Sequence, residues 1–279
     1  MVKRIDLFMP PRSQYGVLHY FTVKLAEALD RIGVKSRTLE AEHENPRPFL
    51  DQLFSDRPDC TLSFNGLLPD DEGHFFCDMI NIPHVACLVD APTQFFSMIK
   101  SPKTIIACAD ESGCEFFRGL HCHHTLFMPH AADITLTSLP LIEERVYDVV
   151  VMSSLIDYQR LRQEWEGQYH PLVCKAMDDA VEMTLSDPST SYVQAFVGAL
   201  DKQVSITGAL DPRKVDFVSI LDDLEIYLKG RSRIESIRAV KDAEVHVFGA
   251  ETETATWKEY LGDITEMTGK MEVHAFFDI

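Results

Sequence analysis

The stretch IDLFMPPRSQYGVLHYFTVKLAEALDRIGVKSRTL, residues 5–39, carries the signals for a strand, a helix and a second strand in succession. Ile5–Phe8 is a short apolar run that suits a buried strand, and a proline-containing loop follows it. Across Leu18–Ile32 the apolar side chains recur at helical spacing, which predicts a helix with one buried face. Gly33 is placed to end that helix, and Val34–Leu39 predicts the second strand. The stretch therefore predicts a β-α-β unit, from which parallel sheets are built.

The same alternation continues to residue 140. Pro48–Phe54 predicts a second helix. Further short apolar runs predict strands at Cys60–Phe64, His84–Val89, Thr104–Ala109 and His124–Met128. Runs that are apolar almost throughout suit parallel strands covered by helices on both faces. Because crossovers between parallel strands are right-handed, residues 1–140 are predicted to form a doubly wound, Rossmann-like α/β domain.

Residues 141–279 are organised differently. Helices are expected at 156–169, 170–185, 191–199 and, as a last long helix, from Asp211-Pro212 onward. Strand signals remain at 145–151, 244–249 and 271–277. We place the domain boundary at Leu136–Val146, where polar residues and Pro140 interrupt the apolar pattern. The predicted fold class is thus α/β: a Rossmann-like parallel sheet, a helix-rich segment and the start of a second Rossmann-like domain.

Composition restricts the class of partner. The formal net charge of −18 opposes binding to nucleic acid or to anionic membrane surfaces, because Lys and Arg dominate both interactions. No apolar run reaches the length of a membrane span, about 18 residues. The N-terminus lacks the apolar core and cleavage site of a signal peptide. The expected location is therefore the cytoplasm, where the 7 cysteines stay reduced.

Flexible or polar residues follow almost every predicted strand of the first domain. In chain order they are Gly16, Asn65, Gly66, Asp90, Asp110, His130 and Asp133. Turn chemistry alone also favours Asn, Asp and Gly at such positions. In open parallel sheets, however, ligands bind beyond the carboxyl ends of the strands. The set, rather than any single member, predicts a binding site at this edge.

Three common motifs of α/β enzymes do not occur in the sequence. No Gly-x-Gly-x-x-Gly surrounds Gly16, which argues against a dinucleotide-binding dehydrogenase. There is also no Gly-x-x-x-x-Gly-Lys and no Gly-x-Ser-x-Gly, so P-loop NTPases and α/β-hydrolases lose their main support. Gly16 is still expected to let the start of the first helix approach an anion or a sugar hydroxyl.

Cysteine and histidine side chains crowd between residues 108 and 130. They are Cys108, Cys114, His121, Cys122, His123, His124 and His130. Thiolates and imidazoles are zinc ligands, but no Cys-x-x-Cys or His-x-x-x-His pair occurs among them. The predicted elements also scatter these residues. A metal-dependent hydrolase is therefore the weakest functional hypothesis, and no metal site is assigned.

Three segments of the chain carry a family resemblance. They are Ile82–Pro92 (IPHVACLVDAP), Leu126–Asp133 (LFMPHAAD) and Tyr147–Ser154 (YDVVVMSS), in this order. They resemble segments of bacterial glycosyltransferases of the two-Rossmann (GT-B) type, including the spore-maturation glycosyltransferase-like proteins. In that family a Leu-Pro-x-Ala-x-Asp segment closes the N-terminal domain, and a Tyr-Asp-Val-x-Phe-x-Gly-Ser strand opens the C-terminal domain. Met152-Ser153 stands where the family tends to have a glycine.

The resemblance implies transfer of a sugar from a nucleotide-sugar donor to an unknown acceptor, with no metal or cofactor. Asp90 and His130 are the implied catalytic residues on the acceptor side. The implied substrate-binding residues are Gly16, Asn65, Gly66, Asp133, Ser153 and Gly249. The later half of the second domain, which usually binds the donor in this family, does not follow the last strand signal. Weak or no activity is therefore expected of this chain.

A non-catalytic binding or assembly module with a Rossmann-like fold is the alternative hypothesis. An incomplete second sheet leaves a strand edge and an apolar face that another chain can cover. This hypothesis expects a homodimer or a complex with a partner protein.

Overall fold

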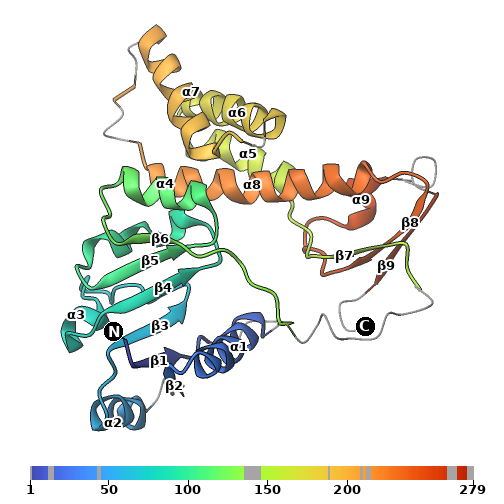
Figure 1. Ribbon diagram of the computed structural model, residues 1–279. Coiled ribbons are helices and arrows are strands. Elements are labelled where there is room, and N and C mark those ends of the chain that lie inside the picture. The colour runs from blue at the N-terminus through green and yellow to red at the C-terminus, as the bar shows by residue number, and fades with distance from the viewer. Residues whose placement is uncertain are drawn as a thin grey trace. The chain divides into compact units, whose positions relative to one another are not determined.

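The computed structural model describes residues 2–11, 16–42, 45–134, 146–187, 189–207, 210–211, 215–262 and 269–274 (Figure 1). Contacts divide the chain into two units, Met1–Leu139 (unit 1) and Pro140–Ile279 (unit 2). The domain boundary expected at Leu136–Val146 lies, except for Val146, outside the described residues. Among the residues described, no helix combines the length and apolar character that crossing a membrane requires.

Unit 1 contains a parallel sheet of six strands. They are β1 (Arg4–Phe8), β2 (Lys35–Leu39), β3 (Cys60–Phe64), β4 (His84–Leu88), β5 (Thr104–Cys108) and β6 (Thr125–Phe127). Their order in space is β2-β1-β3-β4-β5-β6, and every neighbouring pair is parallel. This confirms the predicted Rossmann-like α/β fold of the first half, and each predicted strand overlaps an observed one.

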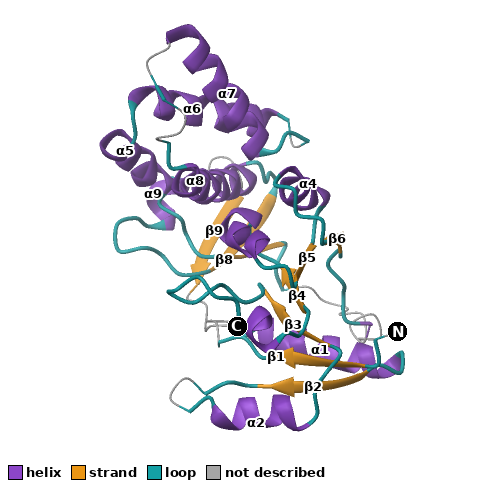
Figure 2. Cartoon of the chain, turned by 90° about the vertical axis from the view of Figure 1, so that its left-hand side faces the viewer, coloured by secondary structure: helices purple, strands orange, loops and turns teal. Residues whose placement is uncertain are grey.

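Helices connect these strands (Figure 2). They are α1 (Val17–Arg31), α2 (Arg47–Ser55), α3 (Phe76–Ile80), the 3-10 helix η1 (Pro92–Lys100) and α4 (Glu111–Gly119). Gly33 follows α1 with a φ of 77°, the left-handed conformation that glycine adopts without strain. The apolar pattern of the sequence does not predict α3 or η1. The five residues of α3 are too few to show a helical period, and η1 is a 3-10 helix, whose side chains repeat about every three residues instead of 3.6.

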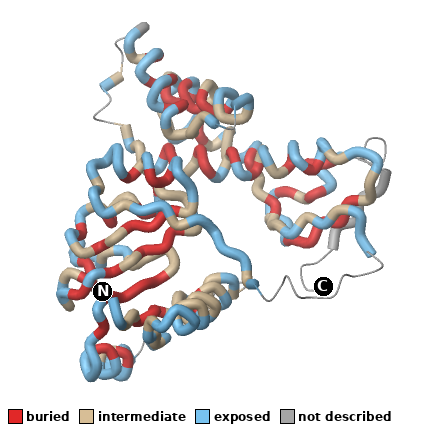
Figure 3. The backbone as a smooth tube through the Cα atoms, viewed as in Figure 1, coloured by how far each residue is buried: buried red, intermediate tan, exposed pale blue. Residues whose placement is uncertain are grey.

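Alternate residues of the strands point to opposite faces and build a core on each face. On one face Leu7 and Leu62 pack against residues of α1. On the other face Phe8 packs against α2. Ile106 packs on that same face against η1 and α4. Figure 3 shows the buried residues (red) running along the strands of this sheet. Helices on both faces give the doubly wound arrangement that the sequence predicts.

Polar side chains are also buried within the sheet of unit 1. Asp6 on β1 has no exposed surface and forms an ion pair of 2.5 Å with Arg37 on β2. His84 on β4 is 1% exposed, and its Nδ1 and Nε2 atoms lie 2.8 Å from Thr61 Oγ1 and 3.0 Å from Ser63 Oγ. Each of these buried groups thus has the partners that its desolvation demands.

Unit 2 contains a second, three-stranded parallel sheet. Its strands are β7 (Val149–Met152), β8 (Ala243–Phe248) and β9 (Gly269–His274), in the order β7-β8-β9. The described residues between β7 and β8 form the helices α5 (Tyr158–Gln168), α6 (Pro171–Ser186), α7 (Tyr192–Thr207) and α8 (Phe217–Arg238). The short helix α9 (Trp257–Leu261) lies between β8 and β9. The strand predicted at 145–151 begins only at Val149 in the structure. The strand predicted at 271–277 begins two residues earlier than expected, at Gly269.

Helix α8 joins the two cores of unit 2. Near its start, Leu224 packs in a helical core with Trp165 and Phe196. Near its end, Ile234 packs with Val245 of β8 in a second core beneath the sheet. A single long helix therefore anchors the helix-rich segment to the sheet that flanks it in sequence.

The start of α8 differs from the prediction. The helix begins at Phe217 rather than at Asp211-Pro212. The carboxylate of Asp216 accepts a hydrogen bond from the Ser219 N–H at 3.3 Å and so caps the first turn. Helix α8 therefore starts after the capping aspartate Asp216, five residues beyond the predicted start at Asp211.

Helix α7 continues beyond the predicted end at Ala199, to Thr207. The polar residues after Ala199 interrupt the apolar pattern. One of them, Gln203, is nevertheless 7% exposed and donates a hydrogen bond to Asp179 on α6 at 3.2 Å. Its burial between helices is a tertiary effect that the apolar pattern does not show.

Candidate functional site

The carboxyl ends of the strands of unit 1 meet at one edge of the sheet, because the strands are parallel. The strand order turns at β1, with β2 on one side and the later strands on the other. Open α/β sheets bind ligands at such a turn, beyond the strand ends. Gly16 lies here as the N-cap of α1, with a φ of 62°. No side-chain hydrogen bond caps α1, and residues 12–15 before it lie outside the described residues.

The turn after β3 is left-handed at two successive residues, Asn65 and Gly66, with φ values of 59° and 64°. A Cβ atom on Gly66 would lie 2.6 Å from the side chains of Ala86 and Met98, so only glycine fits. Asparagine is among the few other residues that tolerate the left-handed region. The backbone path therefore requires glycine at position 66 and favours asparagine at position 65, whose side-chain amide contacts the neighbouring loop.

The Asn65 side chain ties the loop after β3 to the loop after β4. Its Oδ1 accepts hydrogen bonds from the N–H groups of Val89 at 3.0 Å and Asp90 at 3.3 Å. Its Nδ2 donates to Oδ2 of Asp90 at 2.6 Å. These three bonds fix the exposed carboxylate of Asp90 at the edge of the sheet. The structure thus brings together two residues that the sequence selects separately.

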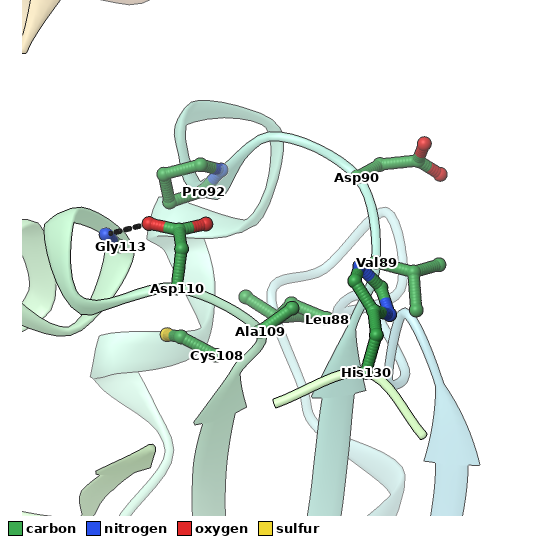
Figure 4. Close-up of a pocket in the computed structure, with 9 residues that line it drawn as sticks. All are labelled: Leu88, Val89, Asp90, Pro92, Cys108, Ala109, Asp110, Gly113 and His130. Carbon is green, nitrogen blue, oxygen red and sulfur yellow. Dashed lines mark hydrogen bonds between the residues drawn. The ribbon is translucent and has the colours of Figure 1, made fainter. Parts of the chain in front are cut away.

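A small pocket opens at the ends of β4 and β5 (Figure 4). It is lined by Leu88, Val89, Asp90, Pro92, Cys108, Ala109, Asp110, Gly113 and His130. In Figure 4 Asp110 lies beside Gly113 at one side of the pocket, and Asp90 and His130 lie at the other. The volume of about 60 Å³ accepts one functional group of a ligand rather than a whole nucleotide. The pocket lies two strands from the turn of the strand order, and the Asn65–Asp90 bond connects the two places.

Asp110 is a pocket residue that the sequence places at this edge of the sheet, without a catalytic or binding role of its own. Its Oδ1 accepts hydrogen bonds of 2.6 Å from the Gly113 N–H and the Ser112 hydroxyl, so it caps α4. The local signal is Asp-Glu-Ser-Gly, an N-cap followed by a helix start. That signal predicts a helix boundary, whereas the place of Asp110 beside the pocket depends on the neighbouring strand β4.

His130 and Asp133 belong to the segment that follows β6. The Met128 N–H donates to the Cys108 carbonyl at 2.8 Å and so extends the β5–β6 pairing toward His130. Asp133 does not line the pocket. Its carboxylate accepts a hydrogen bond of 2.7 Å from the Tyr20 hydroxyl and lies 3.2 Å from Lys24 Nζ.

Ser153 and Gly249 lie together in unit 2, at the carboxyl ends of β7 and β8. The Ser153 N–H donates to the Phe248 carbonyl at 3.0 Å. A Cβ atom on Gly249 would lie 1.9 Å from the Ser153 carbonyl oxygen. The close approach of two backbones therefore requires glycine at this position. Donor binding by the two residues remains a prediction.

The pocket carries negative charge and a non-reactive thiol. Two of its residues are aspartates, and none of the described Lys or Arg residues lines it. Burial raises the pKa of Cys108 to about 12, with further contributions from neighbouring groups such as Cys114. The thiol therefore stays protonated near neutral pH, where a cysteine nucleophile would need to be a thiolate.

Within the described ranges, no group of three or more His, Cys, Asp or Glu side chains is arranged to hold a metal ion. Cys108 and Cys114 do meet, since they share a buried cluster between β5 and α4. His124, by contrast, precedes β6. This arrangement gives the hydrolase hypothesis no support.

A scan against models of protein families and searches of curated proteins and of solved structures found no match to this chain.

Proposed function

We propose that this chain is a weakly active glycosyltransferase of the two-Rossmann type that uses a nucleotide-sugar donor, with the acceptor bound at the carboxyl edge of unit 1. The observation that carries the proposal is that Asp90 and His130 line one pocket from two different loops, while Asn65 on a third loop is hydrogen-bonded to Asp90. Parallel sheets in both units support it. Each segment of the family resemblance also coincides with a strand and its carboxyl-end exit, namely β4, β6 and β7.

The chemistry of the transfer assigns roles to the edge residues. The acceptor hydroxyl donates its proton to Asp90 as the oxygen attacks the anomeric carbon of the donor. The bond between that carbon and the phosphate oxygen breaks, and the nucleoside diphosphate leaves with the electron pair. Asn65 orients the carboxylate for this step through the 2.6 Å hydrogen bond. His130, which lines the same pocket from the segment after β6, binds the acceptor by a hydrogen bond.

The charges of the two edges suit the two substrates. Aspartates in the pocket of unit 1 accept hydrogen bonds from the hydroxyls of a neutral acceptor and repel anionic acceptors. In unit 2, Arg233 on α8 donates to the Ser154 carbonyl beside the end of β7. No ion pair joins Arg233 to a carboxylate of the described residues, and burial lowers its pKa without neutralising it. Arg233 is therefore our candidate for stabilising the departing diphosphate.

Calorimetry and turnover on the full chain test the proposal. The chain is titrated with UDP-glucose, UDP-N-acetylglucosamine and GDP-mannose. In parallel, transfer of the sugar to water is followed as release of the nucleoside diphosphate. We expect Arg233→Gln to weaken binding about tenfold or more, a change of about 1.4 kcal/mol. Asp90→Asn should leave binding within about twofold but lower turnover by about a hundredfold, the low end for a general base.

Matched controls separate these effects from general damage. Arg160→Gln removes an exposed arginine of unit 2 that pairs with Glu164, and Asp71→Asn removes an exposed carboxylate of unit 1. Both should bind and turn over like the parent chain. Absence of binding to every nucleotide sugar, or full turnover by Asp90→Asn, would refute the proposal.

A further inference from the structure

A strap of residues 128–134 crosses the edge of the sheet in unit 1. It begins at Met128, whose N–H donates to the Cys108 carbonyl at 2.8 Å and whose sulfur lies 4.0 Å from the Cys87 sulfur. Residues 129–132 are exposed. Figure 1 shows the strap leaving β6 and passing toward α1. It therefore runs from the β6 side of the sheet, past the end of β4, to the helix that packs on β1 and β3.

The far end of the strap is fixed at Asp133. The side chain of Asp133 is only 7% exposed, although the strap residues before it are open to solvent. Its carboxylate accepts a hydrogen bond of 2.7 Å from the Tyr20 hydroxyl and forms an ion pair of 3.2 Å with Lys24. Tyr20 and Lys24 stand one turn apart on α1, so both present to the same face of the helix.

His130 lies between these two anchors. His130 lines the pocket from the exposed middle of the strap. Asp90 and Asp110, by contrast, follow closely after the ends of β4 and β5. An exposed four-residue bridge has little packing of its own to hold a ring in one place. The position of His130 therefore depends on the anchors at Met128 and Asp133.

We propose that Tyr20 and Lys24 are positioning residues that hold His130 at the pocket by latching Asp133 to α1. The inference rests on the proposed function only for the role of His130, because the latch itself is a structural claim. It assigns Asp133 a different task from substrate binding. It also gives the exposed face of α1 a part in the site, 113 residues away in sequence from the aspartate that it grips.

Backbone relaxation by NMR on the full chain tests the latch without any substrate. In the parent chain, the amides of His130, Ala131 and Ala132 should have order parameters near about 0.85, as rigid backbone has. In Tyr20→Phe and Asp133→Asn they should fall below about 0.6, and the ring signals of His130 should shift. Glu27→Gln removes the other carboxylate partner of Lys24, at 3.0 Å, and should change neither.

Turnover tests the consequence for the site. If the latch acts only through His130, Tyr20→Phe should lower kcat without changing KM for the nucleotide sugar. The double variant Tyr20→Phe/His130→Gln should be no slower than His130→Gln alone. Multiplicative effects in the double variant, or unchanged order parameters in both latch variants, would overturn the proposal. A chain that binds no nucleotide sugar but loses strap order in these variants would refute the glycosyltransferase function and keep the latch.

Discussion

The buried imidazole of His84 makes unit 1 sensitive to mild acid. The ring is 1% exposed and lies between two hydroxyls, those of Thr61 and Ser63, and stacks on Phe8 at 5.8 Å. A neutral imidazole satisfies both hydroxyls, because one nitrogen donates and the other accepts. None of these contacts is with a carboxylate that would stabilise a positively charged imidazolium. Burial accordingly lowers the pKa of His84 from 6.5 to about 4.

The size of the effect follows from linkage. The folded-state pKa lies below the unfolded value, so the unfolded chain takes up the proton first as the pH falls. The contribution of neutral His84 is therefore present above pH 6.5 and is lost between pH 6.5 and pH 4. Between pH 7 and pH 5 the loss amounts to about 2 kcal/mol, or about twentyfold in the unfolding equilibrium.

The assay must report on unit 1. Both tryptophans, Trp165 and Trp257, lie in unit 2, so their fluorescence follows the wrong part of the chain. Hydrogen exchange of peptides from β3 and β4, corrected for intrinsic rates, is the suitable measurement. Protection in the parent should fall about twentyfold more between pH 7 and pH 5 than in His84→Gln, which keeps a donor and an acceptor but does not titrate. Equal pH dependence in the two chains would refute the reasoning.

Three further predictions concern packing and exposure. Gly66→Ala should lower protection of unit 1 by about 2 kcal/mol or more, through steric contact and a strained positive φ, whereas Gly119→Ala, with open space around it, should change little. Among the cysteines, the half-buried Cys122 should react with a thiol reagent in the native chain, and the buried ones only after unfolding. Met152 on the edge strand β7 is 60% exposed, so Met152→Lys should weaken any self-association seen by light scattering, while Met79→Lys, at an equally exposed site of unit 1, should not.

The strands were predictable because burial on both faces leaves its mark on the sequence itself. Cys60–Phe64 is the clearest case, since its predicted and observed bounds agree. The strand exits were predictable for the same reason, because parallel strands gather them at one edge. The hydrogen bonds between the loops at these strand ends were not predictable, because the partner of Asn65 depends on which strand lies beside β3. The partner of Asp133 on α1 depends in addition on the path of the strap, which no local pattern encodes.

The buried polar residues and the exposed site are parts of one arrangement. In the register of β3 and β4, Thr61 lies opposite His84, and the hydrogen bonds of the imidazole to Thr61 and Ser63 hold for that register only. A slip by one residue would place the imidazole against apolar neighbours and leave two buried hydroxyls unpaired, which costs more than an equivalent slip of a purely apolar pair. The same register brings Asn65 beside Asp90 at the strand exits. The desolvated His84 therefore lowers the stability of the sheet below pH 6.5. The same residue specifies the strand alignment on which the Asn65–Asp90 hydrogen bond depends.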